Sequence, residues 1–131
     1  MSEQNVEAGQ RFVEAVNSGD YERPLGGATE DLVFEPRRSA IEGPYLGRNG
    51  LRKFLEDTAE TFDFFQLDLT ELRDLGDRVL GIGTVRVRAR EGGAETAVPM
   101  ACILTFRDGL LAHFKDYGDR SKALEVSRLS D

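Results

Sequence analysis

The hydrophobic and polar positions divide the chain near Asp63 into a helical half and a strand half. Before Asp63, apolar residues recur at spacings of three and four over 3–17 and 50–62, which predicts two amphipathic helices. The polar run 17–20 ends the first helix, and Asn49 is the expected N-cap of the second. After Asp63 the pattern has a period of two, which predicts strands. These strands are expected at 65–74, 78–90, 95–107 and 110–117.

The segments around these elements are shorter. Residues 20–30 are expected to form a short helix interrupted by Pro24, and 32–35 a strand that ends at Pro36. The glycine-rich segment 37–50 reads as a loop with one short strand, and Asp119 is expected to open a C-terminal helix. Helices followed by a run of hairpin-connected strands predict one α+β domain over residues 1–131, rather than a βαβ fold. Strands this long twist and curl, so the concave side of the sheet is the expected pocket.

The hairpin around 91–94 fixes which side chains share a face. Pairing Arg90 with Glu95, and Val87 with Val98, puts charges on one face and apolar residues on the other. The apolar face then holds Val85, Val87, Val98, Met100, Cys102, Leu104 and Phe106. The opposite face holds Arg86, Arg88, Arg90, Glu95, Ala97, Pro99, Ala101, Ile103 and Thr105, with Ile103 as its apolar exception.

Two registers compete in the hairpin around Arg107-Asp108-Gly109. A two-residue Asp-Gly turn puts His113 on the apolar face and Asp116 outside. A three-residue loop puts Leu110, Ala112, Phe114 and Asp116 on the apolar face. We prefer the second register because it sends Lys115 to water and keeps the apolar face continuous. It makes Asp116 the one ionisable group at the end of an apolar strip.

Asp116 is therefore the first candidate for a catalytic residue. Burial raises the pKa of a carboxyl group, which makes it useful as an acid or base near neutral pH. The alternative role is structural: a cap on the following helix, or an ion pair with an arginine. Glu35 is the second candidate. If it points inward it faces Asp116 as an acid/base partner, and if it points outward it pairs with Arg37 or Arg38.

Charge and composition narrow the function classes. The net charge of −7 would repel nucleic acid, and Arg86, Arg88 and Arg90 read as one exposed strand face rather than a binding patch. The apolar runs are too short for a membrane span, and no secretory signal is evident. With His113 as the only histidine and Cys102 as the only cysteine, we expect no disulfide, no histidine metal site and no cofactor. The expected location is the cytoplasm.

Three motifs resemble known sequences. They are the opening run 10–20 (QRFVEAVNSGD), the run 47–55 (GRNGLRKFL) and the closing run from Phe106-Arg107-Asp108-Gly109 to Phe114-Lys115-Asp116-Tyr117-Gly118-Asp119. All three resemble the nuclear transport factor 2-like superfamily, and its SnoaL-like (polyketide cyclase-like) branch most closely. The resemblance implies a cone-shaped, curved antiparallel sheet packed on N-terminal helices around an apolar cavity. It is weakly specific for function, because this scaffold hosts isomerases, hydrolases, cyclases and binding proteins.

Two relatives imply chemistries that this chain does not match. Limonene epoxide hydrolase is similar in the closing run and places its catalytic aspartate at Asp116, but its Arg-x-Asp pair falls at Arg86-Val87-Arg88. Ketosteroid isomerase is similar in the first helix, but its oxyanion-hole tyrosine falls at Phe12 and its second oxyanion acid near Cys102. Its general base falls at Glu35, before Pro36.

The SnoaL-like cyclases need an apolar pocket and one acid/base carboxylate, and Asp116 matches that carboxylate. The expected function is therefore binding of a small hydrophobic molecule, with carboxylate chemistry of cyclase or isomerase type. The alternatives are a non-catalytic binding protein and a structural dimer. Ala97, Pro99, Ala101, Ile103 and Leu111 make the outer sheet face apolar, which predicts a homodimer through that face.

Overall fold

The computed structural model describes residues 2–37 and 39–129. The helices are α1 (Ser2–Asn17), α2 (Glu22–Gly26), α3 (Ser39–Glu42), α4 (Gly47–Thr61) and α5 (Arg120–Leu129). The strands are β1 (Ala28–Glu35), β2 (Tyr45–Leu46), β3 (Phe62–Asp74), β4 (Arg78–Ala89), β5 (Glu95–Arg107) and β6 (Leu110–Asp116). The four strands after Asp63 and the two long helices lie close to their predicted bounds. The α+β fold class is confirmed.

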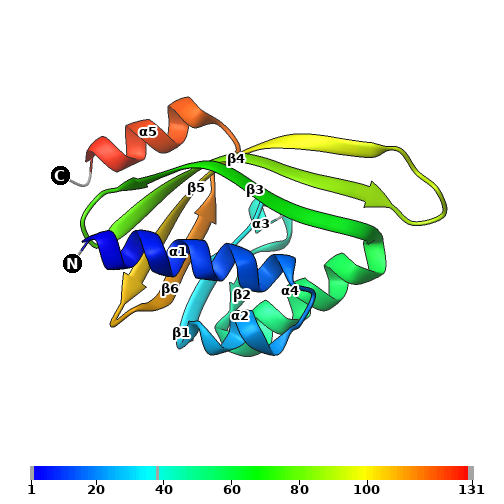
Figure 1. The fold of residues 1–131 in the computed structure, drawn as a ribbon, viewed down its shortest axis with the longest axis horizontal. Helices are drawn as coiled ribbons and strands as arrows, with labels where there is room; N and C mark the ends of the chain where they lie inside the picture. The colour runs from blue at the N-terminus through cyan, green and yellow to red at the C-terminus, as the bar shows by residue number, and fades with distance from the viewer. Residues whose placement is uncertain (1, 38, 130–131) are drawn as a thin grey trace.

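The strands form one curved sheet with the order β2-β1-β6-β5-β4-β3 (Figure 1). β1 and β6 run parallel, and the other neighbours are antiparallel. Figure 1 shows α1 along one side of the sheet and α5 on the other. The main core lies between the concave face and helices α1 and α4, where Phe12, Leu51 and Phe54 are buried against Phe34 and Leu104.

The end of α1 is tied to the free edge of β3. The Asn17 Nδ2 donates to the Leu67 carbonyl at 2.8 Å, and the Leu67 amide donates to the Asn17 Oδ1 at 2.8 Å. Leu67 pairs with Val85 on one side, so these bonds satisfy backbone groups that an edge strand would otherwise leave to water. The polar residue that ends the helix in the sequence thus also fixes the helix on the sheet.

Several boundaries differ from the predictions: β3 begins at Phe62 rather than 65, and the short helix α3 lies in the predicted loop 37–50. The helix predicted at 50–62 begins at Gly47, so Asn49 lies inside it; the N-cap is Leu46, which provides no side-chain cap. β1 begins at Ala28, inside the predicted helix 20–30. The first half of β1 does not show the alternating pattern of a strand, because the consecutive residues Glu30 and Asp31 are both polar and exposed. Ala28, at the start of the strand, is fully buried beside β6.

The first long hairpin keeps the predicted faces in a shifted register. Glu95 lies opposite Arg88, not Arg90, and Val98 lies opposite Val85. Because the shift is two residues, every side chain stays on its predicted face. Val85, Val87, Val98 and Met100 therefore point to the concave side. Arg90 leaves the strand and donates to the Ala59 carbonyl at the end of α4.

The second hairpin combines the two competing registers. Arg107 pairs with Leu110 across a two-residue turn, in which Asp108 (φ 55°) and Gly109 (φ 80°) are both left-handed, the geometry of a type I′ turn. A bulge then follows: Phe106 faces Leu111, whereas Thr105 faces His113, so Ala112 is the extra residue. Beyond the bulge Cys102 faces Asp116, so Asp116 lies on the apolar face that the preferred register gave it. Near the turn that register is wrong, since Leu111 rather than Leu110 enters the main core.

A second bulge lies in the pairing of β3 with β4. The β3–β4 register shifts between Leu69 and Glu71, beside Gly83. A Cβ atom on Gly83 would lie 2.1 Å from the Asp68 carbonyl oxygen, so only glycine fits this close approach of the strands.

Helix α5 covers part of the outer face that was predicted to be available for a partner. Ala101 and Ile103 are buried in a second core with Leu80 and Ala123 of α5. Leu111 belongs to the inner core, because the bulge in β6 reverses its side. The apolar face predicted from five residues is therefore reduced to Ala97 and Pro99, which are exposed. Among the described residues no helix has the length and apolarity to span a membrane.

Candidate functional site

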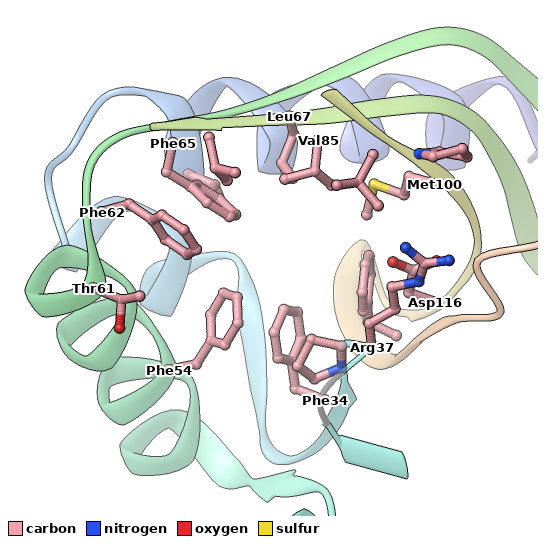
Figure 2. Close-up of a pocket in the computed structure, with 16 residues that line it drawn as sticks. Phe34, Arg37, Phe54, Thr61, Phe62, Phe65, Leu67, Val85, Met100 and Asp116 are labelled. Atoms are coloured by element: carbon pink, nitrogen blue, oxygen red, sulfur yellow. The ribbon is translucent and has the colours of Figure 1, made fainter. Parts of the chain in front are cut away.

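A pocket of about 390 Å³ opens between the concave face of the sheet and α4 (Figure 2). This volume lies in the range of sites for small organic ligands. Thirteen of the sixteen lining residues are apolar: Val16, Phe34, Pro36, Phe54, Phe62, Phe65, Leu67, Val85, Val87, Val98, Pro99, Met100 and Phe114. The five phenylalanines come from β1, α4, β3 and β6, so aromatic rings are supplied from several sides.

The polar side chains of the lining lie at opposite ends. Figure 2 shows Arg37 and Asp116 side by side at one end of the pocket, with Thr61 at the other end beside Phe62. Asp116 is half-buried at the last position of β6, and Arg37 is exposed just after β1. Because β1 and β6 run parallel, both strands end on the same side of the sheet, which brings the two residues together.

Backbone amides hold the Asp116 carboxylate in place. Its Oδ1 accepts hydrogen bonds from the Gly118 amide at 2.8 Å and the Ala101 amide at 3.3 Å. The described residues offer the Oδ2 no hydrogen bond, so this oxygen is available to a molecule in the pocket. The carboxylate is thus fixed through one oxygen and free at the other, which suits proton transfer.

Burial raises the pKa of Asp116 above the ordinary aspartate value of 3.8. The amides of Gly118 and Ala101 oppose this rise by bonding the charged form, and the positive charge of Arg37 opposes it as well. Desolvation outweighs them because the surrounding side chains are mostly apolar. The geometry therefore favours a carboxyl group that exchanges protons more readily near neutral pH than an exposed one.

This raised pKa predicts how stability depends on pH. At a pH below the unfolded-state pKa, near 3.8, Asp116 is protonated in both the folded and the unfolded state and does not change the free energy of unfolding. As the pH rises through the higher folded-state pKa, the ionised carboxylate in the pocket lowers the stability of the native state. We therefore expect Asp116→Asn to be more stable than wild type at pH 7, with a difference that shrinks towards pH 3.5. Urea unfolding at both pH values measures it. Asp108→Asn, in the exposed turn, is the control, and an Asp116→Asn difference independent of pH would contradict the prediction.

Arg37 is the pocket residue that the sequence did not reveal. The turn that carries it is closed by Ser39, whose amide and Oγ both donate to the Pro36 carbonyl at 2.9 and 2.6 Å. Its guanidinium lies against Gly118, where an added Cβ would be 2.6–3.0 Å from Nη2, Nε and Cζ. The sequence shows only that Arg37 directly follows a strand that ends at proline. This position indicates a pocket residue only when it is known that β1 lies beside β6.

Glu35 does not join Asp116. Phe34 points into the core, so the alternation of β1 turns Glu35 to the outer face. There its Oε2 lies 2.6 Å from the His113 Nε2 and its Oε1 lies 3.9 Å from the Lys115 Nζ. The predicted acid/base pair is therefore not formed. The predicted outward alternative is only half right, because Arg37 is not a partner and Arg38 lies outside the described residues.

Cys102, Arg86 and Arg88 occupy positions that are explained by packing or by ion pairs. Cys102 is fully buried opposite Asp116, and burial raises the pKa of its thiol. Arg86 and Arg88 lie on the outer face over the Phe64 ring. Each is near acidic groups: Arg86 lies 3.6 Å from Glu95 and 3.9 Å from Asp68, and Arg88 lies 2.9 Å from Asp63. Within residues 2–37 and 39–129, no cluster of acidic, histidine or cysteine side chains is arranged to hold a metal ion.

Comparison with known families and structures agrees with this architecture. Residues 10–114 match the model of the SnoaL-like domain family. No curated protein matches the chain. Among solved structures, TerC co-crystallised with polyporic acid is 24% identical, with a TM-score of 0.78 over 95% of this chain and 98% of its own.

Two bacterial structures are similar over almost their whole length. An NTF2-like protein of unknown function from Burkholderia pseudomallei is 20% identical, with a TM-score of 0.78, covering 93% of this chain and 95% of its own. A protein from Shewanella denitrificans named as a SnoaL-like polyketide cyclase is 18% identical, with a TM-score of 0.76. The match covers 97% of this chain and 98% of that protein's own. At these identities the likeness shows the fold, and the predicted NTF2-like, SnoaL-like assignment is confirmed.

Proposed function

The chain belongs to the SnoaL-like domain family, and on that premise we propose that it binds a small hydrophobic molecule in the pocket and that Asp116 performs acid/base chemistry on it. The observation that supports this most directly is the carboxylate itself. Asp116 stands at one end of a mostly apolar pocket, held by two amides through Oδ1, and no described residue forms a hydrogen bond with its Oδ2. TerC, with the same fold, was crystallised with a small organic molecule.

The proposed reaction begins with proton removal beside a carbonyl. The Asp116 carboxylate takes the proton, and the C–H electron pair forms an enolate on the substrate. In a ring closure the enolate carbon then attacks a second carbonyl of the same molecule, and Asp116 returns its proton to the new alkoxide. In an isomerisation Asp116 returns the proton to a different carbon. Both reactions need one carboxyl group and a water-poor pocket.

Deuterium exchange of 2-tetralone in D₂O tests this proposal. The probe is an apolar bicyclic ketone with acidic hydrogens at C1. Exchange requires only removal of a C1 proton and return of a deuteron from the solvent to the enolate carbon, without ring closure or isomerisation. We expect wild-type protein to accelerate exchange and Asp116→Asn not to. If wild type binds the ketone but leaves the buffer rate unchanged, the protein is a binding module rather than an enzyme of this type.

We also propose homodimerisation through the exposed part of the outer face. Ala97 and Pro99 on β5 are apolar and exposed, and helix α5 leaves them uncovered; Pro99 also borders the pocket at this edge. Sedimentation velocity of wild type is expected to show a dimer, and Ala97→Glu a monomer, because a buried unpaired charge opposes association. Ala94→Glu, in the exposed hairpin loop, is the control that keeps the dimer. A monomeric wild type at micromolar concentration would contradict the proposal.

A further inference from the structure

We propose that Arg37 is an anion-binding residue at the mouth of the pocket, and that the ligand is an apolar molecule carrying one negatively charged oxygen group. This inference rests on the proposed function, since it assumes that the pocket binds a ligand. It adds the chemical class of that ligand and a specificity-determining residue outside the sheet.

The first support is that Arg37 is positioned rather than free on the surface. Ser39 closes the turn at Pro36 through two hydrogen bonds, and the Ala40 amide donates to the Arg37 carbonyl at 3.2 Å. The guanidinium then lies on Gly118, whose missing side chain leaves the space it occupies. Figure 2 shows the Arg37 side chain extending along the pocket end towards Asp116.

The second support is that no residue in the described part of the chain pairs with the Arg37 guanidinium. Other arginines of this acidic protein form close ion pairs, such as Arg88 with Asp63 at 2.9 Å and Arg107 with Asp31 at 2.6 Å. In the described part of the chain, the Arg37 side chain forms neither a hydrogen bond nor an ion pair. Even Asp116 beside it is not within the 4.0 Å of a salt bridge. Its five donors remain available at the pocket mouth.

The third support is the contrast between this cation and the pocket walls. The rings of Phe34 and Phe114 stack on each other with centroids 4.6 Å apart, and both belong to the apolar pocket lining that includes Arg37. A ligand with an aromatic or polycyclic body fits such walls, and a carboxylate, sulfonate, phenolate or enolate at its edge fits the guanidinium fork. In the proposed reaction Arg37 would hold the enolate oxygen that forms while Asp116 takes the proton.

A matched pair of fluorescent probes tests the inference. 8-Anilinonaphthalene-1-sulfonate and N-phenyl-1-naphthylamine share one aromatic body, and only the first carries an anionic group. We expect Arg37→Gln to weaken binding of the sulfonate about tenfold and to leave the uncharged amine unchanged, as loss of a charged hydrogen bond implies. Arg37→Lys should recover part of the affinity. Asp116→Asn should tighten binding of the sulfonate alone, because it removes a neighbouring negative charge.

The control is Arg11→Gln, which removes the same charge from an exposed position on α1. It corrects for the net charge of the protein, and circular dichroism shows that each variant is folded. Binding of both probes with no selective effect of Arg37→Gln would overturn the inference and leave the proposed pocket intact. Failure of wild type to bind either probe would overturn the proposed function and the inference with it.

Discussion

Replacing Asp116 with asparagine is expected to slow deuterium exchange at C1 of 2-tetralone at least a hundredfold relative to wild type. The expectation follows from the usual contribution of a positioned general base, roughly 10²–10⁴ in rate. An amide has nearly the shape of a carboxylate but does not accept the proton. The rate is read from the loss of the C1 proton signal in NMR spectra.

Asparagine is the sharpest replacement because it keeps the local structure. Its Oδ1 can accept the same two hydrogen bonds from the Ala101 and Gly118 amides that hold the aspartate. The variant also loses the cost of ionising a half-buried group, so instability does not explain a loss of rate. Binding of N-phenyl-1-naphthylamine, measured in parallel, separates loss of chemistry from loss of the pocket.

Glu35→Gln is the matched control, since it removes a carboxylate on the opposite face of the sheet. There Glu35 lies beside His113 and Lys115, and among the described residues no pocket residue forms a hydrogen bond or ion pair with it. We expect its exchange rate to equal that of wild type. Equal rates in Asp116→Asn and wild type would instead show that Asp116 is not the base.

The faces of the sheet were predictable because they depend on a period of two. Val85, Val98 and Met100 reach the pocket although the register of their hairpin differs by two residues from the prediction. A shift of two changes every partner and no face. Period alone therefore identifies the pocket walls without identifying the pairs.

The place of Asp116 depended on a feature that the sequence pattern does not show. The Asp108-Gly109 turn has the two-residue geometry that would turn Asp116 outward, and the bulge at Ala112 turns it back. Alanine carries no signal for a bulge, because an extra residue is recognised by its pairing and not by its side chain. The two-residue register therefore describes the half of the hairpin near the turn, and the preferred register gives the correct face for the half beyond the bulge.

Contacts between distant segments were the least predictable part of the site. Local patterns indicate that β1 is a strand but not that it lies parallel to β6. That pairing places Arg37 beside Asp116 and sends Glu35 to His113. The same limit applies to α5: its sequence predicts a helix, and only the core that Ala123 shares with Ile103 shows which face of the sheet it covers.

Truncation of Phe34 to alanine is expected to lower the free energy of unfolding by about 3–5 kcal/mol, the usual cost of removing a buried phenylalanine ring. Phe34 is 4% exposed, and its ring lies 4.6 Å from that of Phe114, 4.9 Å from that of Phe54 and 6.4 Å from that of Phe12. It thus belongs both to the main core and to the pocket wall. Urea unfolding followed by circular dichroism measures the change.

Phe64→Ala is the comparison, because it removes the same ring from the outer face of β3. Phe64 is half-buried and contacts the guanidinium groups of Arg86 and Arg88 at 5.6 and 5.9 Å from its centroid. Its loss should cost about 1–2 kcal/mol, from partial burial and a solvent-exposed cation–π contact. If Phe34→Ala costs no more than Phe64→Ala, the aromatic wall of the pocket does not support the core. The pocket would then be deformable, and its shape could not select a flat ligand.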